Sequence, residues 1–99
     1  MKAIVKRPGE QAKVIDVLND MEVLQAFVGK DVRPVYARGK DIILCDGEAN
    51  WKLSPWNCRI EDTKFRGTIL IVSQKGADFT DIRDPDYWLD YLDAKEHML

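Results

Sequence analysis

Apolar and polar residues alternate in short segments along most of the chain, and one longer apolar run, residues 67–73, interrupts this pattern. The run is rich in β-branched residues and is followed by the turn-forming pair Lys75-Gly76. A continuous apolar run of this length is typical of a strand that is covered on both faces. We therefore expect residues 67–73 to form the centre of a sheet.

Segments before this run predict paired strands. Residues 2–6 and 13–17 flank Pro8-Gly9, which suits the centre of a type II turn, so they predict an opening β-hairpin. Residues 32–37 and 42–45 predict a second hairpin. Pro34 cannot donate to a ladder, so the first arm of that hairpin is expected to be an edge strand or to be irregular.

The segment after the second hairpin also alternates. Asp46-Gly47 is a strong two-residue turn signal, and residues 48–53 then predict a strand that buries Ala49, Trp51 and Leu53 on one face. Residues 59–65 are polar and have no period, so they predict a loop that holds at most some strand.

Two segments have helical spacing. In a short helix at about 20–28, Asn19 is the expected N-cap, Glu22 completes a capping box, and Gly29 is the expected stop. In a C-terminal helix at about 85–96, Asp84 is the expected N-cap and Pro85 takes the first helical position.

These elements predict one domain that spans residues 1–99, of the α+β class. It should contain a mostly antiparallel sheet of about five to six strands, one short helix and a C-terminal helix. The opening order of hairpin, helix and strand leaves a ubiquitin-like β-grasp as an alternative.

Composition limits the kinds of location and functional site that we expect. No run approaches the roughly 20 apolar residues of a membrane span, and the charged N-terminus lacks the apolar region of a secretion signal, so a cytoplasmic protein is expected. Cys45 and Cys58 are then expected to be free thiols, and together with His97 they lack the spacing of a metal site. We expect neither a cofactor nor an enzymatic activity.

Charge is distributed unevenly although the net charge is only −2. The acidic excess lies in residues 78–96, which favours a solvated helix face or a surface that meets a basic partner. Candidate partner-binding residues lie in this helix and in the loop at Trp56: they are Trp56, Asn57, Arg59, Asp86, Asp90 and Asp93. An alternative is a basic, aromatic sheet edge that binds nucleic acid, with Arg33, Tyr36, Arg38 and Lys40.

Five short segments carry a resemblance to known proteins: Met1–Glu10, Leu24–Gly29, Pro55–Asn57, Gly67–Val72 and Asp78–Ile82. They resemble a family of small uncharacterised proteins, catalogued as a domain of unknown function, from gut-bacterial mobile elements and phages. That family often has an arginine directly after the asparagine of its Pro-x-Asn segment, whereas here Cys58 follows Asn57 and the arginine is Arg59. The resemblance implies a mobile-element or phage setting and no particular activity.

The functional hypothesis is therefore a small cytoplasmic accessory protein of a mobile element or phage that binds an unknown protein partner. The alternative is a nucleic-acid-binding module. No membrane association is expected, and the protein should be a monomer or a weak dimer, because the edge at residues 32–37 is either available for pairing or blocked by Pro34.

Overall fold

The computed structural model describes the backbone of residues 1–97 and the side chains of residues 1–93. Within these residues the chain forms eight strands and two helices, an α+β fold as the sequence predicts. In chain order they are β1 (Lys2–Lys6), β2 (Lys13–Asp16), α1 (Met21–Val28), β3 (Val32–Tyr36), β4 (Asp41–Asp46), β5 (Trp56–Ile60), β6 (Thr63–Arg66), β7 (Ile69–Lys75), β8 (Asp78–Thr80) and α2 (Pro85–His97).

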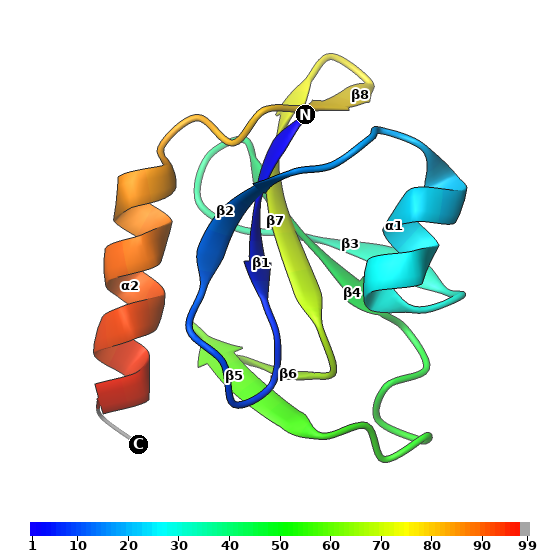
Figure 1. The fold of residues 1–99 in the computed structure, drawn as a ribbon, viewed down its shortest axis with the longest axis vertical. Coiled ribbons are helices and arrows are strands. Elements are labelled where there is room, and N and C mark those ends of the chain that lie inside the picture. The colour runs from blue at the N-terminus through cyan, green and yellow to red at the C-terminus, as the bar shows by residue number, and fades with distance from the viewer. Residues whose placement is uncertain (98–99) are drawn as a thin grey trace.

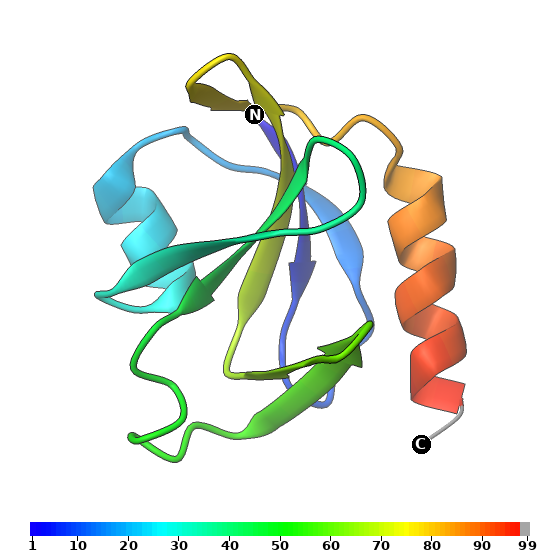
Figure 2. The ribbon, with the colours of Figure 1, turned by 180° about the vertical axis from the view of Figure 1, so that it is seen from behind.

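The main sheet of the described chain has six strands in the order β2-β1-β7-β4-β3, with β8 paired to β7 outside this path. All of these pairs are antiparallel. The β-grasp alternative does not fit, because a β-grasp sheet pairs its first strand in parallel with a central strand, whereas β1 pairs antiparallel with β7. The strands β5 and β6 form a separate hairpin, which lies across one end of the sheet in Figures 1 and 2.

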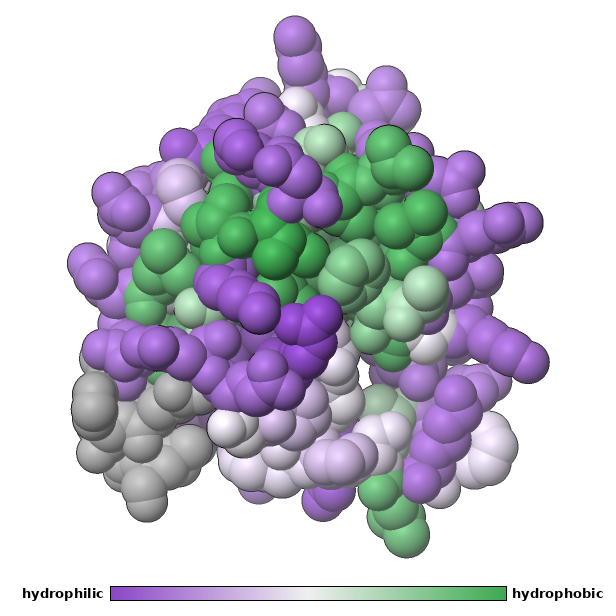
Figure 3. Space-filling view, in the orientation of Figure 1, coloured by the Kyte–Doolittle hydropathy of each residue, from purple (hydrophilic) through white to green (hydrophobic). Residues whose placement is uncertain are grey.

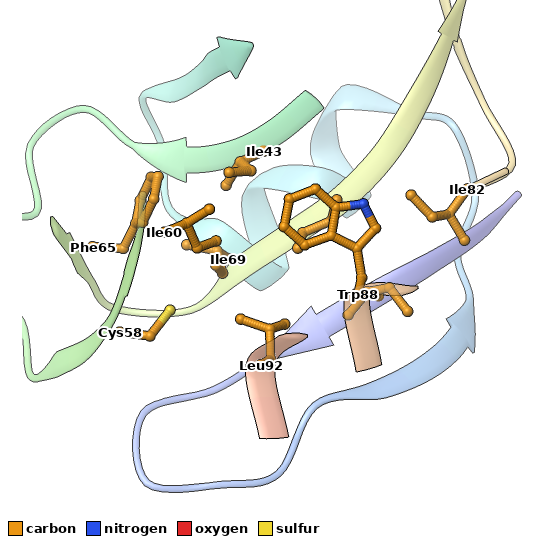
Figure 4. Close-up of a cluster of buried hydrophobic side chains, with 10 residues drawn as sticks. Ile43, Cys58, Ile60, Phe65, Ile69, Ile82, Trp88 and Leu92 are labelled. Carbon is orange, nitrogen blue, oxygen red and sulfur yellow. The ribbon is translucent and has the colours of Figure 1, made fainter. Parts of the chain in front are cut away.

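The central position of β7 confirms the prediction from the apolar run. Ile69 and Ile71 lie in a core cluster on the face that α2 and the β5–β6 hairpin cover, as Figure 4 shows in part. Leu70 and Val72 lie in a second cluster on the opposite face, under α1. All four side chains are fully buried. A strand with both faces covered has no polar face, which is why its sequence does not alternate.

The helix α1 begins one residue later than the capping prediction. Asp20, not Asn19, is the N-cap: its carboxylate accepts hydrogen bonds from the backbone N–H groups of Glu22 and Val23. The side-chain amide of Asn19 donates instead to the carbonyl of Phe79, which joins this turn to β8. The helix ends at Gly29, as predicted.

The helix α2 begins as the sequence predicts, with Pro85 first and Asp84 Oδ1 accepting from the N–H of Tyr87 at 3.3 Å. Trp88 and Leu92 on this helix are buried against the sheet (Figure 4). The Trp88 indole Nε1–H donates to Asp41 Oδ2 at 2.8 Å, so a polar bond reinforces this packing.

Residues 48–53 do not form the predicted strand. They form consecutive turns, and Trp51 and Leu53 are 74% and 78% exposed, so the expectation that Trp51 lies in the core is wrong. Only Ala49 of the predicted apolar face is buried. The polar stretch after them, expected to be mainly a loop, instead provides much of the β5–β6 hairpin.

The strand β3 is an edge strand, as Pro34 predicts. At the two ends of its ladder, the N–H of Ala37 donates to the carbonyl of Asp41, and the N–H of Gly47 donates to the carbonyl of Asp31. Odd-numbered residues of β3 are therefore bonded to β4, and even-numbered residues direct their backbone groups outward. The missing N–H of Pro34 lies on the free edge, where the ladder does not need it.

Candidate functional site

The loop between β4 and β5, residues 47–55, has a defined conformation that holds large apolar side chains in solvent. Asp46 caps its first turn by accepting from the N–H of Glu48 at 3.0 Å, and the N–H of Ser54 closes the loop onto the carbonyl of Ala49 at 3.0 Å. Lys52 forms ion pairs with Asp46 and Glu48, both at 3.2 Å. Figure 3 shows hydrophobic atoms projecting at the lower right, where this loop lies.

We define the aromatic loop surface as Trp51, Leu53 and Trp56. Their side chains are 74%, 78% and 41% exposed. They fall within six consecutive positions, at the end of the loop and the start of β5. The backbone φ of Leu53 is 56°, a left-handed value that is uncommon for a residue other than glycine. Leu53 lies at the last turn before the chain enters the hairpin.

The β5–β6 hairpin has an apolar inner face and a basic outer face. Cys58, Ile60 and Phe65 are buried in the core cluster under the hairpin. Arg59 is paired across the strands with Lys64, and Trp56 with Arg66. Arg59 and Lys64 are exposed.

Arg59 and Lys64 form a basic row on this outer face, and the exposed acids Glu61 and Asp62 lie in the turn that joins the two strands. Like charges directly opposite one another weaken a strand pair. Within the described part of the chain, no ion pair joins Arg59 or Lys64 to an acidic group. Arg66 donates to the carbonyl of Ser54 at 3.0 Å, which ties the hairpin to the preceding loop.

Asn57, one of the predicted partner-binding residues, has a structural position. Its side chain is buried, and Nδ2 donates to the carbonyl of Lys6 at 2.8 Å and to the carbonyl of Gly67 at 2.7 Å. These bonds join β5 to β1 and to the turn before β7. Its Oδ1 has no hydrogen-bond partner among the described residues. We therefore leave Asn57 out of the candidate binding surface.

The predicted acidic residues lie on α2, apart from the aromatic loop surface. Asp86 and Asp90 are exposed one turn apart, on the side of the helix away from the buried Trp88. Asp93 is partly buried and accepts from the side-chain amide of Gln11 at 3.4 Å. The helix also packs against the hairpin: Leu92 lies in the same core cluster as Cys58 and Ile60, and the N–H of Glu61 donates to the hydroxyl of Tyr91 at 3.0 Å.

The structure does not bring the four predicted nucleic-acid-binding residues into one patch. Arg33 forms an ion pair with Asp31 at 2.9 Å, and its position on β3 faces opposite to that of Tyr36. Arg38 forms an ion pair with Asp84 at 3.4 Å and lies over the ring of Tyr87, 3.8 Å from the centroid. The fourth residue, Lys40, is exposed in the turn before β4.

The cysteines are poorly placed for reaction. Cys58 is buried, and Cys45 is partly buried with its thiol 3.6 Å from the carbonyl oxygen of Arg33. Burial raises the pKa of the Cys45 thiol, and the carboxylates of Asp46 and Asp31 raise it further. A pocket of about 200 Å³ adjoins Cys45; its lining includes Asn50, Lys64, Phe65 and Arg66.

Among the described residues, no group of three or more metal-binding side chains occurs. The side chain of His97 lies outside the described residues. No helix in the described part is long and apolar enough to cross a membrane.

Sequence reasoning found Trp56 and Arg59 but missed their neighbours on the same surface. The alternation of residues 48–53 predicts a buried face for Trp51 and Leu53, and the sequence pattern does not single out Lys64 or Arg66. The turn-forming residues around the loop, Asp46-Gly47 and Ser54-Pro55, were the available signal that residues 48–53 are too short and too confined for a strand.

The comparisons with known proteins identify the family. The family described as "Domain of unknown function (DUF3846)" matches residues 1–93. The chain therefore belongs to this family. No curated protein and no solved structure matches the chain.

Proposed function

We propose that this member of the DUF3846 family is a small cytoplasmic accessory protein of a mobile element or phage, and that it acts by binding a protein partner. It would bind through the aromatic loop surface and would have no catalytic step of its own. The mobile-element or phage setting rests on the resemblance of the five sequence segments described above.

The observation that carries this proposal is the exposure of Trp51, Leu53 and Trp56 within six consecutive positions, at the end of one loop and the start of β5. Tryptophan is among the residues that contribute most to binding energy at protein interfaces. Clustered exposed apolar side chains with polar neighbours are typical of interaction sites. Lys52 and its two acidic partners supply such a polar rim.

Capture from the native host tests the proposal. Immobilised wild-type protein should retain one partner at near-stoichiometric yield, and the double variant Trp51→Ser, Leu53→Ser should lose it. Tyr36→Ser is the matched control, since Tyr36 is an exposed aromatic residue, at 66%, on a different strand. The purified partner should then bind wild-type protein in calorimetry, with a Kd at least about 10-fold lower than that of the double variant.

Two results would refute this assignment. Capture that survives the double variant would mean that the aromatic loop surface is not the contact. Loss of capture in Asp86→Lys, Asp90→Lys alone would place the contact on the acidic face of α2 instead. Thermal unfolding of each variant checks that the fold is retained, and all five positions are exposed.

Single-stranded nucleic acid is a second candidate ligand, favoured by one specific observation. Arg59 and Lys64 form no ion pair with an acidic group among the described residues, and they lie on the same hairpin as Trp56 and Arg66. Non-specific single-strand binding combines basic groups along the backbone with aromatic rings on which bases stack. The sequence pI near 5.3 argues for weak rather than strong binding of this kind.

Fluorescence anisotropy with a labelled oligothymidylate tests this second candidate. Binding should weaken as salt rises, and Arg59→Glu, Lys64→Glu should abolish it. Arg33→Glu is the matched control, because Arg33 is an exposed arginine on a different strand, β3, and forms an ion pair with Asp31. Anisotropy that stays constant at low salt would exclude the oligonucleotide as a ligand of this hairpin.

A further inference from the structure

The two free edges of the main sheet differ in their capacity to pair. On β3 the outward-facing backbone includes Pro34, which has no N–H to donate. On β2, Met1 and Val17 exchange hydrogen bonds of 2.9 and 2.8 Å, which fixes odd-numbered residues as those bonded to β1. Val14 and Asp16 therefore direct complete N–H and C=O groups away from the sheet.

Apolar side chains surround this open edge. Val14, Leu18 and Met21 are 38%, 70% and 53% exposed, and Ile15 is partly exposed. Figure 3 views the molecule onto β2 and shows a broad hydrophobic area that extends from this strand toward α1. An open edge with exposed apolar flanks favours the addition of another strand.

Geometry limits how a second copy of β2 would pair antiparallel with the first. Outward-facing residues must oppose outward-facing residues, so the two-fold axis passes through a residue and not between two residues. The two central residues of β2 are Val14 and Ile15. An axis through Val14 sets Leu18 opposite Glu10 of the second copy. An axis through Ile15 sets Leu18 opposite Ala12 and places the two Ile15 side chains together, on the face that α1 covers.

We propose that the protein forms a symmetric dimer in which β2 pairs antiparallel with β2 of a second copy, with the two-fold axis at Ile15. The strand is self-complementary in this register. Lys13 opposes Val17 and Asp16 opposes Val14, so no like charges lie directly opposite one another. The match of apolar with apolar side chains at Ile15–Ile15 and Leu18–Ala12 favours a second copy as the occupant.

The dimer extends the proposed function without depending on it. The strand β4, which leads into the aromatic loop, is three positions away from β2 in the sheet, a distance of about 14 Å at the usual strand spacing. The two aromatic loop surfaces of a dimer stay accessible. A partner with repeated binding sites would then be held by both copies at once.

Sedimentation equilibrium of the purified protein tests the dimer. The strand is four residues long, so we expect weak association, with a mass that rises from one chain toward two between about 10 µM and about 1 mM. Ile15→Lys and Ile15→Glu should each raise the dimer Kd about 10-fold or more, because each brings like charges together at the axis. A mixture of the two variants should associate again.

Substitutions with little effect on folding keep the test decisive. Leu18→Glu, at a highly exposed position, should also raise the dimer Kd. Val14→Pro removes an outward-facing N–H from β2, as Pro34 does on β3, and it leaves the hydrogen bonds to β1 intact, so it should prevent association. Tyr36→Pro, at an outward-facing position on β3, is the matched control and should leave association unchanged. A wild-type mass of one chain at every concentration overturns the proposal, as does a mixture of the Ile15 variants that stays monomeric.

Discussion

Asp41 joins α2 to the main sheet through one buried carboxylate. Its Oδ1 accepts from the hydroxyl of Ser73 at 2.8 Å, and its Oδ2 accepts from the indole N–H of Trp88 at 2.8 Å. Asp41 is only 5% exposed, and Ser73 in turn accepts from the backbone N–H of Arg83 at 3.0 Å. Substitution of Asp41 should therefore affect β4, β7 and α2 together.

The expected magnitude follows from these bonds. A hydrogen bond to a charged group contributes about 1.5–3 kcal/mol, and a buried donor left without an acceptor has its own desolvation cost. Asp41→Ala leaves the Ser73 hydroxyl and the Trp88 indole N–H without this acceptor. The substitution should therefore lower the free energy of unfolding by about 3–5 kcal/mol. That is a large share of the roughly 5–15 kcal/mol that stabilises a typical domain.

Urea denaturation followed by far-ultraviolet circular dichroism measures this loss. Asp41→Asn keeps an acceptor for Trp88 and should lose only about 1–2 kcal/mol. Trp88→Phe removes one donor and supplies the second arm of a double-mutant cycle, in which the coupling to Asp41→Ala should be about 1–2 kcal/mol. Asp78→Ala, at an exposed acid on β8, is the control and should change stability by less than about 0.5 kcal/mol.

Two outcomes would refute this account of Asp41. If Asp41→Ala has the stability of wild type within about 0.5 kcal/mol, the carboxylate does not hold α2 in place. If Asp41→Ala and Trp88→Phe are additive, the short contact between their atoms contributes nothing, and the packing of the indole ring alone accounts for the position of α2.

Three further substitutions or reactions have defined outcomes. Leu70→Ala, in the fully buried centre of β7, should lower the free energy of unfolding in urea by about 2–5 kcal/mol, and a loss below about 0.5 would contradict its place in the core. The raised pKa of the Cys45 thiol keeps it protonated at neutral pH, so labelling by a disulfide reagent should be slow at pH 7 and accelerate as pH rises; labelling at the rate of free cysteine would contradict this. Gly29→Ala should cost at least about 1 kcal/mol in thermal unfolding, because φ is +135° and the added carbon would lie 2.5 Å from Asp46 Oδ2. Unchanged stability in this variant would mean that the turn after α1 rearranges freely.

Prediction from sequence worked where the pattern is set by burial on both faces or by backbone chemistry. The unbroken apolar run gave β7, because a strand covered on two faces needs no polar positions. Pro34 gave an edge strand, since only a free edge tolerates the missing N–H. Asp84 and Pro85 gave the start of α2, because both act within the first turn and need no tertiary context.

Prediction failed where tertiary context decided the outcome. Residues 48–53 alternate like a strand, but the turns closed by Asp46 and Ser54 use their backbone groups locally, so only Ala49 is buried. The β5–β6 hairpin was missed because its outer positions are charged and its inner ones are few. The pairing of Arg59 with Lys64 depends on strand register, which the sequence does not determine.

In the 47–55 loop, the groups that stabilise the conformation differ from the side chains that are proposed to bind a partner. Its turns are closed by backbone groups and by the ion pairs of Lys52, and none of these bonds uses the side chains of Trp51 or Leu53. Polar residues at these two positions would therefore close the loop equally well and would avoid a cost in solubility. Folding alone does not account for large apolar side chains there. A double serine variant that keeps its stability and loses its partner is the result that connects this exposure to function.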